Sequence, residues 1–449
     1  MTAIRTAGRT AARTATWTNW AGDRTSHPTS VVRPRDEEEV VRAVRTATER
    51  GLTARAVGSG HSFSDLVCTD GVMIDLSRMN RVLSVDAHHV TLQAGITLRE
   101  LGPRNAEHGL SLENQGDIDA QTMAGALATA THGTGRAFGN LSSRVVGMRL
   151  VTADGTVRQL DRTTTPELLR AARVSLGALG IVTEVTVSCV PAFALRRVDR
   201  PRPLDDVLAE LDQLVDTHDH FEFFIWPYTR TAMTRTSTRT DEAQIPTPHW
   251  RRRLREEFAE NTVLGALCRV GRRFPSLVPT VNATIARSMS ESRVEDVAHR
   301  VYATARKVKF TESEYAIPRR HCADALTACL DLVERQHLPI LFPFEVRFTA
   351  PDDAYLSTAE GRETCYLAAH QYRGMDADPF FRAFEDVMVT YGGRPHWGKR
   401  HTRTASDLRP LYPHWDDFAE RRTELDPTGT FANAHTRRVL GTHDEVVTR

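Results

Sequence analysis

Residues 56–65, AVGSGHSFSD, decide the fold and most of the function of this chain. Two glycines without Cβ atoms allow backbone amides to turn inward and bind a pyrophosphate, and the serines around them add hydroxyl donors. The candidate binding residues are Gly58, Ser59, Gly60, His61, Ser62, Phe63 and Ser64. The segment lacks the third glycine and the following helix of the Rossmann fingerprint, and no Lys-Ser/Thr pair follows as in a Walker loop. By itself it equally suits a tight turn that carries a surface histidine.

Two further stretches of small residues lie downstream. Residues 114–135, NQGDIDAQTMAGALATATHGTG, predict an Ala/Gly/Thr-rich helix that lets backbone approach a flat ligand, although a close helix–sheet contact without a ligand is the alternative. Residues 174–187, VSLGALGIVTEVTV, predict a turn between apolar strands. The candidate cofactor-binding residues in both stretches are Gly116, Asp117, Gly125, Thr129, Thr131, His132, Gly133, Gly180, Ile181 and Val182. Three such turns in one domain favour an extended dinucleotide over a single phosphate.

Outward from these turns, residues 31–192 alternate short apolar runs with turns. Acidic residues at 36–39 and apolar spacing from Val40 to Ala47 predict a helix that stops at Gly51. The runs TARAVG, VMIDLS and HHVTLQAG predict strands, and GMRLVTADGTVRQL predicts a hairpin around Asp154 and Gly155. A helix between strands, followed by several strands, predicts an α+β domain rather than a long βαβ series.

The composition changes after Pro191. Longer amphipathic segments at 204–220 and 321–337 predict helices, and FEFFIWP and PFEVRFTA predict strands between them. Residues 229–296 are rich in Arg, Thr and Pro with weak periodicity, which predicts a long excursion or loop. We expect a disordered leader at 1–16, with a transit-like leader as the alternative, and domains at 17–193 and 194–449. The alternative for the C-terminal tail is that it packs back on the first domain.

The bulk composition excludes several classes of partner. The chain has 449 residues, 40% of them hydrophobic, and its 58 basic and 57 acidic residues leave a net charge of +1, so neither nucleic acid nor an acidic membrane surface is expected. No run of about 18 apolar residues predicts a membrane span. The six cysteines form no CxxC pair, so no metal site or redox dithiol is predicted. Reduced, mostly buried thiols fit the cytoplasm.

Six motifs together carry a resemblance to a known family. GSGHSFS, ATATHGTG, SLGALGIVTEV, EYAIP at 314–318, FEVRF at 344–348 and RPHWGK at 394–399 stand in this order over nearly the whole chain. In this the chain resembles the aldonolactone oxidoreductases of the L-gulono-1,4-lactone dehydrogenase and D-arabinono-1,4-lactone oxidase type. They belong to the vanillyl-alcohol-oxidase flavoproteins, and alditol oxidases are close relatives. The resemblance implies an α+β fold with a two-part FAD-binding domain of the PCMH type at 17–193 and an α+β cap domain for the substrate.

The resemblance also implies roles for single residues. It makes His61 the covalent anchor of FAD, bonded to the flavin 8α-methyl group, with a non-covalent hydrogen-bond donor as the alternative. It places Glu345, Arg347 and Lys399 at the substrate, and His370 matches a histidine of the alditol oxidase pocket. Independently, Glu345 and Arg347 share one face of a strand, and a charged pair on an apolar strand needs a partner or a pocket. A salt-bridged surface strand is the alternative.

Two positions, Asp117 and Gly116, bear on the substrate and on the electron acceptor when they are compared with the family pattern. Asp117 stands where alditol oxidases have a serine beside the substrate, which favours a lactone over a linear polyol. Gly116 stands at the position that gates oxygen access to the flavin. Glycine there would permit oxidase behaviour, but the actinobacterial dehydrogenases also carry glycine. The acceptor therefore stays open between oxygen and a cytochrome or quinone-like partner.

The expected function is oxidation of a secondary alcohol of a sugar 1,4-lactone by hydride transfer to flavin N5. Positive charge is needed near the reduced flavin, which Arg347 and Lys399 would supply. Which group takes the hydroxyl proton is open. The alternatives are an alditol oxidase acting on xylitol or sorbitol, a binding protein on a degenerate flavin scaffold, and a nicotinamide-using reductase.

Overall fold

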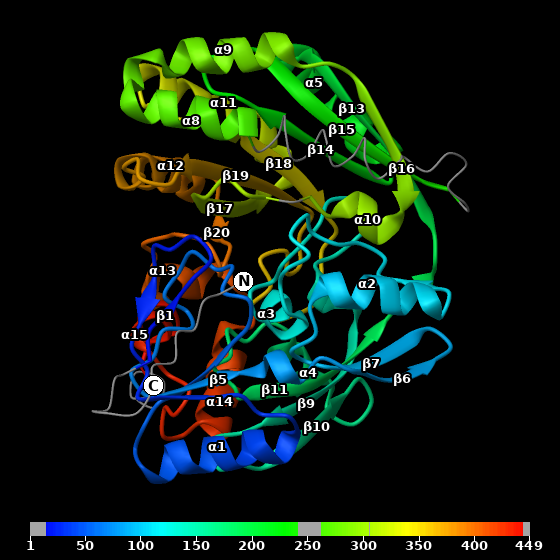
Figure 1. Ribbon diagram of the computed structural model, residues 1–449, viewed down its shortest axis with the longest axis vertical. Helices are drawn as coiled ribbons and strands as arrows, with labels where there is room; N and C mark the ends of the chain where they lie inside the picture. Colours follow the sequence, from blue (N-terminus) through cyan, green and yellow to red (C-terminus); the bar gives the residue numbers. More distant parts are fainter. Residues whose placement is uncertain (1–14, 241–261, 305, 443–449) are drawn as a thin grey trace.

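Three larger β-sheets organise the protein, and the computed structural model describes residues 15–240, 262–304 and 306–442 (Figure 1). Two of the sheets build one half of the molecule, which is the lower half in Figure 1, and the third builds the other half. The expected leader at 1–16 falls almost wholly outside the described residues, of which Ala15 and Thr16 are the first.

The first sheet is parallel, and its strand order is β3 (Ser30–Val32), β5 (Val72–Asp75), β4 (Ala54–Val57). The helix predicted after β3 is confirmed as α1 (Glu37–Glu49), and the Asp36 side chain caps it by accepting a hydrogen bond from the Glu39 amide. Its apolar stripe, including Val40 and Val44, is buried against the sheet. This packing aims the carboxyl end of β4, and with it the turn that begins at Gly58, toward the middle of the molecule.

The second sheet is antiparallel and carries the predicted hairpin. Its order is β10 (Val157–Asp161), β9 (Val145–Val151), β11 (Ile181–Ser188), β7 (His89–Gln93), β6 (Val82–Asp86). Gly155 closes the β9–β10 turn with φ of +74°, a conformation that glycine adopts without strain. A mixture of short helices with parallel and antiparallel sheets confirms the α+β class.

The third sheet is the wall on which most candidate catalytic residues lie. Its eight strands are antiparallel, in the order β16 (Ser292–Val297), β13 (Ala194–Pro203), β15 (Thr231–Thr240), β14 (His220–Ile225), β18 (Phe344–Thr349), β19 (Thr364–Tyr372), β17 (Phe310–Pro318), β20 (Arg394–Pro395). One face packs on an apolar core with α11 (Cys322–Arg335) and α12 (Asp378–Thr390). The other face turns toward the first half of the molecule (Figure 1).

The remaining α-helices are short and cover the sheets. They are α2 (Leu98–Glu107), α3 (Met123–Ala128), α4 (Pro166–Arg173), α5 (Leu204–Ala209), α6 (Leu211–Thr217), α8 (Leu264–Arg273), α9 (Val278–Ser288), α10 (Ala298–Tyr302), α11 (Cys322–Arg335), α12 (Asp378–Thr390), α13 (Ala405–Leu408), α14 (Trp415–Leu425) and α15 (Ala434–Leu440). The segment expected as one helix at 204–220 is thus divided into α5, α6 and the start of β14.

The expectation of a long loop at 229–296 is wrong for the described part of that segment. It contains strand β15, helices α8 and α9, and strand β16, whereas residues 241–261 lie outside the described residues. The sequence of β15, TAMTRTSTRT, lacks apolar alternation because Ala232 and Thr234 are buried on one face while Met233 and Arg235 line a cavity on the other. β-branched threonine favours a strand in spite of its polarity.

The C-terminal segment packs on the first half of the molecule. Trp415, Phe418 and Val439 share an apolar core with Leu92 of β7 and Leu150 of β9. Figure 1 shows α14 and α15, in red, among the blue and green elements of that half. The sequence predicts that residues 194–449 form one cap domain. In the structure, described parts of this range contribute to both halves.

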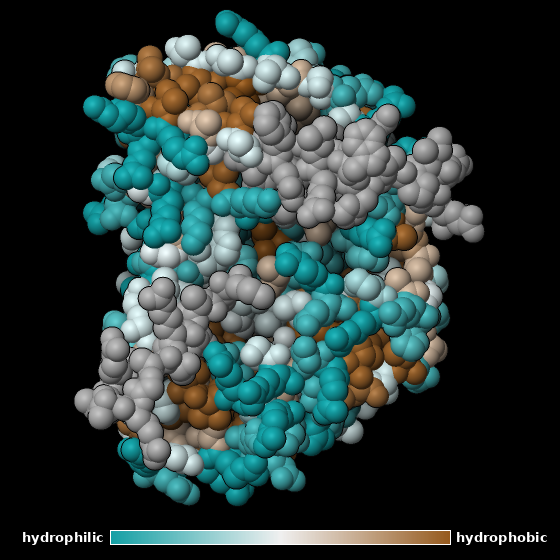
Figure 2. Space-filling model, in the orientation of Figure 1, coloured by the Kyte–Doolittle hydropathy of each residue, from teal (hydrophilic) through white to brown (hydrophobic). Residues whose placement is uncertain are grey.

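One face of the molecule is mostly hydrophilic, with hydrophobic residues gathered over α8 and α9 (Figure 2). Val270, Phe274 and Leu277 are exposed there. Within the described ranges, none of the helices combines the length and apolar character that a membrane crossing requires.

Candidate active site

The turn after β4 forms one wall of a narrow channel. Gly58 lies so close to Thr122 that an added Cβ would stand 2.2 Å from the threonine Oγ1. Thr122 caps α3 and accepts a hydrogen bond from the Gly125 amide at 3.3 Å. Gly60 has φ of +68°, which suits glycine. The backbone of the turn thus lies directly against the hydroxyl side chain of the helix cap.

The other two small-residue turns reach the same channel. Gly180 has φ of +152°, and an added Cβ would stand 2.6 Å from the Val151 carbonyl oxygen. The channel encloses about 100 Å³. The predicted residues that line it are Gly58, Ser59, Gly60, His61, Ser62, Gly125, Thr129, Gly180 and Val182. Ser64, Gly133 and Ile181 do not line it, since Ser64 and Ile181 are buried in the protein interior and Gly133 packs against Asn114.

The channel opens into a much larger chamber of about 670 Å³. His61, Ser62 and Thr129 line both spaces. The His61 ring stacks on Trp20 with a centroid distance of 5.3 Å, and burial lowers the pKa of His61 to about 4. An extended dinucleotide flavin fits this shape, because its pyrophosphate needs an amide-lined channel and its tricyclic ring needs a wide chamber beside it.

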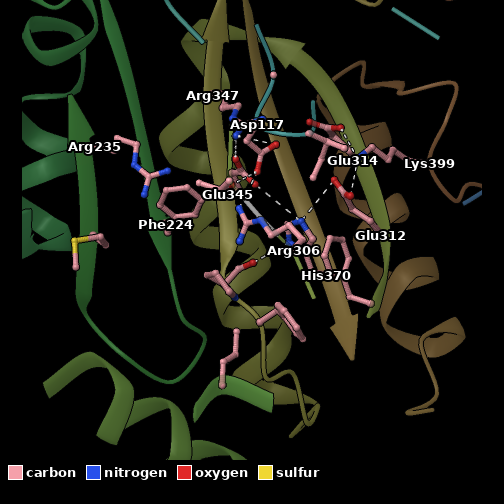
Figure 3. A pocket seen from close by; sticks show the side chains of 18 of the residues that line it. Asp117, Phe224, Arg235, Arg306, Glu312, Glu314, Glu345, Arg347, His370 and Lys399 are labelled. Atoms are coloured by element: carbon pink, nitrogen blue, oxygen red, sulfur yellow. Dashed lines mark hydrogen bonds and ion pairs between the residues drawn. The ribbon is translucent and has the colours of Figure 1, made fainter. Parts of the chain in front are cut away.

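The eight-stranded sheet supplies the opposite wall of the chamber. Glu345 and Arg347 of β18 point to the same face, as strand geometry predicts, and the Arg347 guanidinium contacts the Glu345 carboxyl group (Figure 3). Both are buried, so they are not a surface pair. Arg347 also donates to Glu222 of β14 at 2.6 Å and lies 3.6 Å from Asp117. The Asp117 carboxylate accepts a further bond from Arg306 at 2.8 Å.

This arrangement affects the pKa of each acid. Burial raises the pKa of Glu345 to about 8, and the nearby Asp117 and Glu222 carboxylates add to the increase, against the opposing effect of Arg347. Burial acts in the same direction on Asp117, but Arg347 and Arg306 outweigh it and hold the pKa of Asp117 below its usual value. Because three carboxylates share Arg347, Glu345 is the one that keeps its proton at neutral pH.

Lys399 and His370 lie on the same side of the chamber. The Lys399 ammonium is 2.5 Å from Glu312 and 3.7 Å from Glu314, and these carboxylates raise the pKa of Lys399 although burial lowers it. His370 of β19 lies between the Glu312 and Glu345 carboxylates (Figure 3). The structure therefore brings His61, Lys399 and Arg347 to one cavity, as the motifs predict.

Sequence reasoning missed several charged residues of this chamber. Glu312 and Glu314 occupy alternate positions of β17, the same spacing that singled out Glu345 and Arg347, so the strand rule could have found them. Glu222 and Arg306 had no such signal. Arg306 follows α10 in an irregular segment, and Glu222 is one acid in an aromatic strand.

Three buried side chains beside Lys399 have the composition of a metal site. Ligand atoms of His132, Glu314 and His396 lie within 4.8 Å of one another. His132 Nε2 is 3.1 Å from Glu314, and His396 Nδ1 accepts a hydrogen bond from the Gly398 amide at 3.1 Å. The Lys399 ammonium lies against the same carboxylate. We assign the three to the hydrogen-bond network that holds Lys399, since a cation next to an ammonium is electrostatically disfavoured.

Comparisons with known proteins agree with this geometry. Residues 28–161 match an FAD binding domain, and residues 185–439 match the D-arabinono-1,4-lactone oxidase family. The chain is 54% identical over 427 residues to L-gulono-1,4-lactone dehydrogenase of Mycobacterium tuberculosis, covering 95% of this chain and 99% of that protein. It is 34% identical to L-gulonolactone oxidase of Bos taurus, covering 94% and 97% of the two chains. Alditol oxidase of a Streptomyces species is 32% identical, with 94% and 98% covered.

A solved structure extends the comparison to the fold. Cholesterol oxidase from Brevibacterium sterolicum superposes with a TM-score of 0.79 at 17% identity, covering 98% of this chain and 99% of that one. At this identity the likeness concerns the fold alone. The cofactor is FAD, and the protein is a flavin-linked oxidoreductase. The chain belongs to the D-arabinono-1,4-lactone oxidase family of FAD-dependent enzymes.

Proposed function

We propose that the protein oxidises L-gulono-1,4-lactone or a closely related aldono-1,4-lactone at the secondary alcohol beside the lactone carbonyl. The observation that carries the proposal is the buried Glu345–Arg347 pair, which faces the same chamber as His61 and Lys399. The 54% identity to a gulonolactone dehydrogenase supports the substrate class. FAD, when bound, accepts the hydride from the oxidised carbon.

The protein's own residues have separate tasks in this proposal. Arg347 orients the lactone, because its planar guanidinium has five N–H donors and is held by the Glu222 carboxylate and the Glu345 carboxyl group. Glu345, which keeps its proton below about pH 8, can donate a hydrogen bond to a substrate oxygen. Lys399 supplies positive charge where negative charge develops during the reaction. Asp117, anchored by Arg306, limits the space beside Arg347 and favours a ring over a flexible polyol.

We propose further that His61 bonds covalently to FAD. A ring nitrogen must carry a free electron pair to form such a bond, and the lowered pKa of His61 keeps its imidazole neutral at physiological pH. Stacking on Trp20 restricts the orientation of the ring. Both features support covalent attachment over a hydrogen bond.

Electrons then pass either to oxygen or to a cytochrome or quinone-like acceptor. Gly116 lines the chamber without a side chain, which supports access of a small acceptor. We place the reaction in the cytoplasm, in keeping with six cysteines that are all unpaired.

Anaerobic mixing of the holoenzyme with a panel of lactones and polyols tests the proposal. We expect L-gulono-1,4-lactone to bleach the flavin absorbance faster than xylitol or sorbitol, and admission of air or cytochrome c then identifies the acceptor. Faster bleaching by polyols would favour an alditol oxidase instead. Bleaching by neither class would exclude the proposed reaction.

A further inference from the structure

Lys399 is held between two carboxylates that make different contacts. Glu312 and Glu314 point to the same face of β17, and their Oε2 atoms lie 2.5 Å and 3.7 Å from the Lys399 nitrogen. The second oxygen of Glu314 lies 3.1 Å from His132, whose ring stacks on Tyr366 with a centroid distance of 3.5 Å. The second oxygen of Glu312 faces His370 instead, at 3.6 Å from Nε2. Glu312 alone therefore bridges Lys399 and His370.

The orientation of His370 makes this bridge chemically useful. Its Nδ1 lies 3.1 Å from the Pro343 carbonyl oxygen, which can only accept, so Nδ1 carries the hydrogen. The electron pair of the neutral ring is then on Nε2, and this atom faces Glu312 and, at 4.0 Å, Glu345. A neutral imidazole with a free Nε2 in a substrate chamber can accept a proton.

We propose that Glu312 is a positioning residue that holds Lys399 and His370 in one geometry and stabilises the imidazolium form of His370 when the substrate hydroxyl is deprotonated. The inference rests on the proposed function. The hydroxyl O–H bond breaks and an Nε2–H bond forms on His370, while the hydride of the same carbon goes to FAD, the oxidant. The alcohol becomes a ketone, and the carboxylate of Glu312 balances the new positive charge.

The charges around His370 determine the sign of the pH effect. The groups that face it are Glu312 from β17, Glu345 from β18, the Lys399 ammonium and the Arg306 guanidinium. Burial lowers the pKa of His370, Glu312 opposes that change, and Lys399 adds to it. Removal of the Glu312 charge must therefore lower the pKa of His370 further, because it removes the attractive charge that lies 3.6 Å from Nε2.

The test compares Glu312→Gln with Glu314→Gln in the anaerobic rate of flavin reduction across pH. Glu314→Gln is the matched control, because it removes an equal charge beside Lys399 without touching His370. In Glu312→Gln we expect the acid limb of the profile to move down by on the order of one pH unit. The maximal rate should fall on the order of tenfold. Glu314→Gln should leave the acid limb in place, and Glu312→Asp should restore part of the shift.

A second measurement does not depend on turnover. The Cε1–H resonance of His370, assigned by its loss in His370→Asn, reports its protonation directly in isotope-labelled holoenzyme. We expect this resonance to titrate at lower pH in Glu312→Gln than in the wild type, with no such change in Glu314→Gln. Equal shifts in the two variants, or none in either, would overturn the proposal. If no lactone bleaches the wild-type flavin, the proposed function fails, and the titration still decides the role of Glu312.

Discussion

His61 enters the chamber from a turn in which Gly58 leaves room for Thr122 and Gly60 adopts a left-handed conformation. Its imidazole is neutral because burial lowers its pKa to about 4. On the opposite wall, each acidic side chain contacts at least one basic side chain, either Arg347 or Lys399. The chemistry of each side chain is therefore determined by its neighbours, and three predictions follow at this scale.

The first concerns the link to FAD. His61→Ala removes the nitrogen that we propose to bond to flavin, so acid precipitation should release flavin into the supernatant while the folded variant keeps part of its activity. In the wild type the flavin should stay with the precipitate. His88→Ala, which changes an exposed histidine, is the control and should behave as the wild type. Release of flavin from the wild type would show that the link is not covalent.

The second concerns the ammonium group. Lys399→Met removes a positive charge from the chamber and leaves Glu312 and Glu314 uncompensated. We expect flavin reduction by lactone to slow on the order of a hundredfold or more, the effect seen when one preorganised charge-stabilising group is removed. Stopped-flow absorbance measures the rate. Lys309→Met alters an exposed lysine and should leave it unchanged. A near-normal rate in Lys399→Met would remove this residue from the mechanism.

The third concerns stability against pH. The pKa of Glu345 is raised to about 8 in the folded protein, so the folded state binds a proton that the unfolded chain has already lost near its ordinary pKa. Stability from this group is complete in acid and is lost as pH rises through about 8. The melting temperature of the wild type minus that of Glu345→Gln should therefore decrease between pH 5 and pH 8 and level off above about 9. A difference that grows with pH would contradict the protonated state of Glu345.

At the scale of elements, the site depends on close approach between short segments. β4 and α3 are brought together by the contact of Gly58 with the cap residue Thr122. β17 and β18 each display two charged side chains on one face, and their alternation aims four ionisable groups at the chamber. Strand geometry therefore fixes the direction in which these four side chains point. Asp117 and Arg306 reach the chamber from loops.

Gly58→Ala tests the contact of β4 with α3. The new methyl group would stand 2.2 Å from Thr122 Oγ1, so the cap must move away from the channel. In a His61→Ala background, where FAD binds reversibly, we expect the affinity for FAD to fall on the order of tenfold, since loss of a cap costs about 1 kcal/mol and tenfold corresponds to about 1.4 kcal/mol. Gly265 lies in α8, and Gly265→Ala places its methyl 3.6 Å from Val308, an ordinary contact, so this variant should bind FAD with unchanged affinity.

At the scale of the whole molecule, the C-terminal segment is a structural part of the first half. Arg55 of β4 donates to the Phe431 carbonyl at 2.6 Å and to the Leu176 carbonyl at 2.6 Å. Asn433 donates to the carbonyls of Asp65, Leu66 and Cys68. We propose that the folding unit that holds FAD comprises residues 17–193 together with this segment. A chain cut at residue 193 would expose the core that Trp415 and Phe418 fill.

Asn433→Asp tests the anchor of this segment. Aspartate still caps α15, but it replaces the donating amide with a carboxylate that faces three carbonyl oxygens. We expect a loss of about 2 kcal/mol or more in the free energy of unfolding, measured with urea, because the buried acceptors lose their partner. Asp36→Asn makes the reverse exchange at the cap of α1 and should change stability by a few tenths of a kcal/mol. Equal losses in the two variants would assign the effect to capping alone.

The prediction from sequence succeeded where the signal is local. The helix at 37–49, the hairpin around Gly155 and the paired orientation of Glu345 and Arg347 follow from spacing within one segment. It failed at β15, because the face of that strand that lines the chamber carries both Met233 and Arg235, so the strand lacks the apolar alternation on which the rule relies. It also passed over Glu312, although the alternation of Glu312 and Glu314 on β17 is a local signal; its contacts with Lys399 and His370 are set by other elements.

The amino-acid sequence alone determined the α+β class and the glycine turns, and its resemblance to the aldonolactone oxidoreductases made His61, Arg347 and Lys399 candidate site residues. The class and the turns depend on backbone conformation and residue spacing over a few positions. Only the tertiary structure decided that three carboxylates share Arg347, that Glu312 bridges Lys399 and His370, and that the C-terminal segment completes the first half. Electrostatic interactions and core packing depend on distance in space, and antiparallel pairing of distant strands creates those distances.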